Sequence, residues 1–69
     1  MLKSYKVSWH QYTDPNIAHG DKVTNLLVMA GSKIDAKSNV VKILGKQYIQ
    51  LWGCRNFEAE ETPCYKGGR

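Results

Sequence analysis

The N-terminal part of the chain alternates between apolar and polar side chains. In the stretch KSYKVSWHQY, residues 3–12, the side chains of Tyr5, Val7 and Trp9 fall on one face, with serine, lysine and histidine between them. Period-two alternation among residues that favour β-structure is typical of a strand with one buried face. We therefore predict a strand here, and a loop over residues 13–20, which contain Asp-Pro-Asn and a glycine.

The segment DKVTNLLVMAG, residues 21–31, supports two interpretations. Its apolar residues recur at the i, i+3, i+4, i+7 spacing of an amphipathic helix, Asp21 is a suitable N-cap, and a glycine stands at the C-cap. The valines and threonine of the same segment would also suit a strand. A competing helix would cover residues 33–44, capped by Ser32 and ended by Gly45. We prefer the helix at residues 21–31.

The following segment, NVVKILGKQYIQLWG, favours a β-hairpin. Two β-rich runs, residues 40–44 and 47–52, flank the pair Gly45-Lys46. A Gly-X pair fits a two-residue type II′ turn, because the first central position requires φ > 0. The chain as a whole then predicts an α+β fold: a small β-α-β-β domain with a three- to four-stranded, mostly antiparallel sheet and one helix. The alternative is a small open β-barrel.

Length and composition indicate one small globular domain. The chain has 69 residues, of which 42% are hydrophobic and 23% charged, so it is near the lower size limit for an unaided core. We assign residues 1–57 to a single α+β domain and residues 58–69 to an acidic then basic tail, with an edge strand at most. Because the apolar runs are too short to span a bilayer and no charged-then-apolar leader begins the chain, we expect a cytoplasmic protein.

The charge of the chain is unevenly distributed. Its net charge is +4, and residues 1–56 hold eight basic against three acidic side chains, whereas residues 57–69 hold three acidic against two basic ones. A basic body favours anionic partners, nucleic acid above all, through long-range attraction and counterion release. The basic residues are spread singly, however, so solubility alone would also explain this charge.

Four aromatic residues could share one face of the predicted sheet: Tyr5, Trp9, Tyr48 and Trp52. If that face is open, it offers a stacking platform for unpaired bases, worth roughly 1–3 kcal/mol per base. If the helix covers it, the same residues form the core, which is the interpretation we favour in so small a chain. For the open face, the candidate residues for binding nucleic acid or another partner are Lys6, Lys42, Lys46, Tyr48, Trp52 and Arg55.

Two other kinds of binding protein fit the same sequence. Small single-domain chains without motifs are characteristic of accessory proteins of phages and mobile elements. Such a protein could be a protein–protein inhibitor that occludes a host nucleic-acid-processing or defence complex, as anti-CRISPR proteins do, with tyrosine and tryptophan as anchors. A homodimer through an exposed sheet edge is a further option. The expected partner is therefore nucleic acid, or a protein complex that handles nucleic acid.

The search for catalytic chemistry is negative. The stretch AGSK lacks the leading glycine of a phosphate-binding loop, and Cys54 has no histidine partner evident from the sequence. Cys54 and Cys64 are expected to be reduced thiols, and neither they nor His10 and His19 show zinc-site spacing. We predict that the protein is not an enzyme and has no catalytic residues, metal or cofactor.

Overall fold

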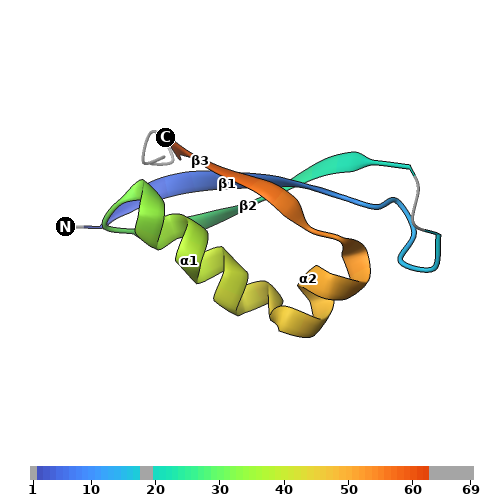
Figure 1. Ribbon diagram of the computed structural model, residues 1–69. Helices are drawn as coiled ribbons and strands as arrows, with labels where there is room; N and C mark the ends of the chain where they lie inside the picture. Colours follow the sequence, from blue (N-terminus) through green and yellow to red (C-terminus); the bar gives the residue numbers. More distant parts are fainter. Residues whose placement is uncertain (1, 18–19, 63–69) are drawn as a thin grey trace.

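The computed structural model describes residues 2–17 and 20–62, and it packs two helices against one face of a sheet (Figure 1). The strands are β1 (Lys3–Gln11), β2 (Lys22–Ala30) and β3 (Arg55–Thr62). The helices, which lie between β2 and β3 in the sequence, are α1 (Lys33–Leu44) and α2 (Lys46–Trp52). This arrangement confirms the predicted α+β class with a three-stranded sheet, and the sheet is open rather than closed into a barrel.

β1 is the central strand of the sheet. The strand order is β2-β1-β3, and both neighbours of β1 are antiparallel to it. The predicted alternation is confirmed: Tyr5, Val7 and Trp9 are buried on the face that the helices cover, whereas the residues between them lie on the other face. Pairing with β2 is regular along the whole strand, but pairing with β3 shifts register between Ser8 and His10.

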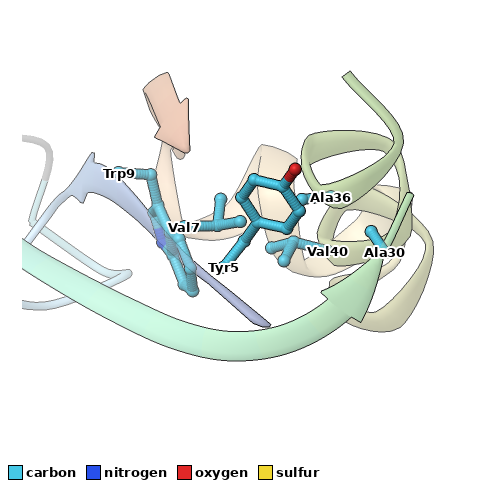
Figure 2. Packing of buried hydrophobic residues seen from close by; sticks show 6 residues of the cluster. All are labelled: Tyr5, Val7, Trp9, Ala30, Ala36 and Val40. Atoms are coloured by element: carbon cyan, nitrogen blue, oxygen red, sulfur yellow. The ribbon is translucent and has the colours of Figure 1, made fainter. Parts of the chain in front are cut away.

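The core lies between β1 and α1. Its buried hydrophobic residues are Tyr5, Val7, Trp9, Ala30, Ala36 and Val40 (Figure 2). Ala36 and Val40 are one helical turn apart on α1, so both meet the side chains that alternate along β1. Trp9 also stacks on Phe57 of β3, with ring centroids 5.6 Å apart, so all three strands contribute to one cluster.

The prediction of a helix at residues 21–31 is wrong, because this segment forms β2. Its helical spacing of apolar residues coincides with an alternation in which Leu26 and Val28 point toward the core and Leu27 and Met29 point outward. Pairing along all nine residues with β1 outweighs the local helical pattern. The competing helix forms instead, and the Ser32 hydroxyl caps α1 by accepting a hydrogen bond from the backbone N–H of Asp35 at 3.2 Å.

The predicted hairpin around Gly45 is also wrong, because the residues before it end α1 and those after it form α2. Gly45 does have the expected positive φ, 87°, but it separates two helices rather than two strands. Val40 and Leu44 are one turn apart on α1, and Tyr48 and Trp52 are one turn apart on α2. The element order is therefore β-β-α-α-β rather than β-α-β-β.

The C-terminal segment assigned to a tail divides into two parts. Residues 58–62 continue β3, which lies at one edge of the sheet. Residues 63–69, including Cys64, lie outside the described part of the chain.

Candidate functional site

Aromatic side chains gather around α2 at one end of the helical layer. Tyr48 and Trp52, one turn apart on α2, stack with ring centroids 5.8 Å apart and an interplanar angle of 27°. The ammonium group of Lys22, at the start of β2, lies 5.7 Å from the centroid of the Trp52 ring. The backbone N–H of Tyr12 donates to the carbonyl of Trp52 at 2.8 Å, which fixes α2 against the end of β1. We call Lys22, Tyr48 and Trp52 the α2 cluster.

A buried glutamine orients this cluster. Gln11 is only 2% exposed, and its Oε1 accepts a hydrogen bond from Trp9 Nε1 at 2.8 Å and another from the Tyr48 hydroxyl at 3.4 Å. The Cys54 thiol lies 3.9 Å from the same oxygen, and desolvation raises the pKa of this thiol. The amide of Gln11 therefore connects Trp9 of the core to Tyr48 of the α2 cluster. It also provides an acceptor for the buried indole N–H of Trp9, which would destabilise the fold if it had no partner.

An ion cluster connects the loop end of the β1–β2 hairpin to the start of β3. We call this end of the hairpin, where His10 and Asp21 lie, the hairpin base. One carboxylate oxygen of Asp21 lies 2.9 Å from His10 Nδ1, and the other pairs with the guanidinium of Arg55. The hydrogen bond with His10, followed by the contributions of Arg55, lowers the pKa of Asp21 despite partial desolvation. Arg55 also donates to the Gly53 carbonyl at 2.8 Å and lies 5.4 Å from the Tyr12 ring centroid. The guanidinium charge of Arg55 is therefore largely neutralised by contacts within the protein.

The structure separates the residues predicted to bind a partner. Lys46, Tyr48 and Trp52 come together on α2, and Lys42 is exposed in the last turn of α1. Lys6 lies instead on the uncovered face of the sheet, on the strand position opposite Leu27 and Glu60.

The four aromatic residues do not share one face of the sheet, and only two of them belong to the core. Tyr5 and Trp9 are each 4% exposed and belong to the core, whereas Tyr48 and Trp52 lie on α2 and remain half-buried.

Lys22 and Tyr12 are the contributors that the sequence analysis missed. The hairpin register pairs Lys22 with Gln11, so assigning residues 21–31 to a strand would have placed this lysine beside the end of β1. Tyr12 is the last residue of the alternating stretch and lies just after β1. It reaches the cluster through its backbone bond to α2, for which the sequence has no local signal.

Ion pairing leaves the helical side of the protein positively charged. Within residues 2–17 and 20–62, the ion pairs are Lys3–Glu61, Arg55–Asp21 and His10–Asp21. The basic residues in this part of the chain that pair with no described acidic group include one on β2 and four on the helices: Lys22, Lys33, Lys37, Lys42 and Lys46. β3, in contrast, carries three glutamates, so the two long sides of the molecule differ in charge.

A shallow groove of about 450 Å³ runs between β2 and α1. It is lined by Val28, Met29, Asn39, Lys42 and Ile43. The lining is mainly apolar, with one amide and one ammonium group, and so lacks the convergent acid, base and nucleophile that catalysis requires. Across the described residues, histidine, cysteine and carboxylate side chains form no group of three that could hold a metal ion.

Comparison with protein-family models, curated proteins and solved structures found no match for this chain. Neither α1 nor α2, the helices of the described part, is long and apolar enough to cross a membrane.

Proposed function

We propose that this protein is a small non-enzymatic binding protein that engages nucleic acid through the α2 cluster and the neighbouring lysines. The observation that carries the proposal is the contact of Lys22 with Trp52, which itself stacks on Tyr48. An aromatic pair with an adjacent ammonium group can accept an unpaired base on a ring while the lysine meets the phosphate beside it.

The charge distribution supports an anionic partner on the helical side. The segment of residues 33–52 holds four lysines and one aspartate, and none of these lysines is neutralised by a described carboxylate. The glutamates of β3 would repel phosphate along the opposite edge of the sheet. A nucleic-acid strand would therefore follow α2 and the last turn of α1, where Lys42 and Lys46 are exposed.

Lys6 and Arg55, both predicted to bind, take different roles in this proposal. Lys6 lies on the other face of the sheet from the α2 cluster, so it contributes only to the long-range field. Arg55 holds the hairpin base in place through Asp21 and Gly53.

Fluorescence anisotropy with single- and double-stranded DNA and RNA tests the proposal. We expect binding to a single strand to weaken by an order of magnitude or more between about 50 and about 200 mM salt. Lys22→Gln and Lys46→Gln should each weaken binding and reduce the salt slope by about 0.7, the release from one phosphate contact on a single strand. Lys3→Gln is the matched control, because it removes the same charge from a lysine paired with Glu61 at the far end of β1.

Tryptophan fluorescence adds a local readout. Trp9 is buried, so quenching by a bound base should arise from the half-buried Trp52 and disappear in Trp52→Phe. Absence of binding at about 50 mM salt, or equal losses for Lys3→Gln and Lys22→Gln, would contradict the proposed surface.

A second candidate function is inhibition of a host nucleic-acid-processing or defence complex by occluding its surface. The observation that favours it is the uncovered face of the sheet, where Val23, Leu27 and Met29 are 60%, 64% and 50% exposed. An exposed apolar strip is typical of a surface that binds another protein, whereas the phosphate backbone of nucleic acid would not contact it favourably. Absence of nucleic-acid binding, together with a protein complex that Lys6→Glu on this face disrupts, would favour this second function.

A further inference from the structure

β2 is an edge strand whose free backbone groups can be assigned. The Met29 carbonyl accepts a 3.5 Å hydrogen bond from Asn39 Nδ2 of α1, so it points away from β1. In an antiparallel pair, alternate residues direct both backbone groups to the same side. Since Met29 points outward, the residues that direct their N–H and C=O groups away from β1 are Val23, Asn25, Leu27 and Met29.

Apolar side chains flank this free edge on both sides. On the uncovered face, β2 exposes Val23, Leu27 and Met29. On the helical face, Ile43 is 62% exposed and lines the groove with Val28. A strand added to β2 would therefore cover apolar surface above and below the sheet. It would also pair the outward backbone groups of Val23, Asn25 and Leu27 and the N–H of Met29, whose carbonyl already accepts from Asn39.

The two edges of the sheet differ in their protection against pairing. β3 has a register shift opposite β1, a residue with positive φ (Asn56, 57°) and three glutamates, which are devices that keep an edge from accepting another strand. β2 has none of these: its pairing with β1 is regular over nine residues, and its only charged residue is Lys22 at one end. Within residues 2–17 and 20–62, only the β2 edge is open to another strand.

We propose that β2 pairs antiparallel with β2 of a second copy of this chain, which joins the two three-stranded sheets into one of six strands. Two outward-facing residues must meet in each hydrogen-bonded pair, and the register that uses the whole strand places Leu26, its middle residue, on the two-fold axis. In this register Val23 meets Met29 of the partner, and Asn25 meets Leu27 of the partner.

Charge and pattern favour a second copy over a different ligand. The two-fold axis sets Val23 against Met29 of the partner at both ends of the strand pair, and it places the two Lys22 residues at opposite ends. They are then separated by eight residue steps, roughly 25 Å. An acidic peptide would meet two ammonium groups, that of Lys42 beside the groove and that of Lys22 at one end of β2. Because each copy carries a net charge of +4, screening by salt should strengthen the dimer, opposite to its expected effect on nucleic-acid binding.

Sedimentation equilibrium of the full chain tests the dimer without nucleic acid, so its result is independent of the function proposed above. We expect a monomer–dimer equilibrium whose dimer fraction rises with protein concentration and with salt. Leu27→Lys, on the uncovered face of β2, should weaken association at least tenfold. Leu51→Lys, on α2 and similarly exposed at 55%, is the matched control and should leave association unchanged.

Cysteine cross-linking tests the register independently of these substitutions. In a background with Cys54→Ser and Cys64→Ser, a mixture of Asn25→Cys and Leu27→Cys chains should form disulfides readily, because paired Cα atoms lie about 5.5 Å apart. Each variant alone should cross-link less, since its two cysteines are then diagonal.

Three outcomes would overturn the proposal. These are a monomer at all concentrations and salt concentrations, a dimer that Leu27→Lys leaves intact, or equal cross-linking of the single variants. A monomer whose Val23 and Leu27 amides become protected from hydrogen exchange only when oligo-glutamate is added would assign the edge to a peptide instead.

Discussion

Gln11 shows how much one buried side chain determines at this size. Its carboxamide oxygen serves both Trp9 and Tyr48, so Gln11→Leu should leave the buried indole N–H of Trp9 without an acceptor. We expect a loss of about 1–3 kcal/mol in the free energy of unfolding, measured by urea denaturation. Gln50→Leu on the exposed side of α2 is the control and should change it by less than about 0.5 kcal/mol. Equal effects would show that the amide network does not stabilise the fold.

Asp21 makes the stability of the hairpin base depend on pH. The pKa of its carboxyl is lowered in the folded protein, mainly by the hydrogen bond with His10, so ionised Asp21 stabilises the folded state. This contribution is complete above the ordinary value of 3.8 and is lost as the pH falls through the lowered pKa. Asp21→Asn should therefore lose less stability than wild type between about pH 5 and about pH 2, in urea denaturation at each pH. Equal losses would contradict the assigned ion cluster.

Side-chain positions were predictable where they follow from local alternation. The burial of Tyr5, Val7 and Trp9 was predicted correctly because a strand with period-two polarity has only one face that can be buried. The burial of Gln11 could not be predicted in this way. It lies on the same buried face of β1, but it is polar, and its hydrogen-bond partner Tyr48 is 37 positions away in the sequence. The cluster around α2 depends on contacts of this kind.

At the scale of elements, Gly45 decides where one helix ends and the next begins. Its φ of 87° and ψ of 153° lie in a region that is essentially restricted to glycine, and a Cβ there would meet no atom within 4 Å. Gly45→Ala should therefore lower the free energy of unfolding by about 1–3 kcal/mol through backbone strain alone. Gly31→Ala is the control, because that position lacks a positive φ and a Cβ would have only ordinary contact with Asp35. An unchanged stability in Gly45→Ala would show that the break between α1 and α2 is not strained.

Element type was predictable for β1 but not for the segments on either side of Gly31. Residues 21–31 fit helical and strand spacing equally well, and only pairing with β1 decides between them. The valines and isoleucine of residues 40–44 favoured a strand locally, yet these residues are helical because Val40 and Leu44, one turn apart on α1, pack into the core cluster. The positive φ of Gly45 was predicted correctly. However, a turn between two helices and a turn between two strands can both require a glycine with positive φ, so the glycine alone does not distinguish them.

At the scale of the molecule, the described residues form two layers, and the helices cover one face of the sheet and leave the other open. The chain extends over 41 × 22 × 15 Å, and its helices lie on one side of the sheet only (Figure 1). The net charge of +4 could be read from the sequence, but its separation into a basic helical side and an acidic β3 edge depends on the strand order. The same order places β2 at an edge, with Val23, Leu27 and Met29 exposed on the uncovered face.

The small core makes the protein sensitive to the truncation of a single buried side chain. Val7 is fully buried at the centre of β1, so Val7→Ala should cost about 2–3 kcal/mol. Total stability at this length is on the order of 3–10 kcal/mol, so the midpoint of thermal unfolding should fall by roughly 10–20 °C. Val23→Ala, at a position that is 60% exposed, makes the same chemical change on the uncovered face and should cost less than about 0.5 kcal/mol in dilute solution.

The dependence of the Val23→Ala effect on protein concentration connects stability to assembly. Val23 becomes covered only when β2 pairs with a second copy, so its replacement should cost more as the concentration rises, whereas the cost of Val7→Ala should stay constant. Thermal unfolding of both variants over a wide concentration range measures this difference. A large cost for Val23→Ala at every concentration would mean that the uncovered face is buried within the monomer, contrary to the fold described above.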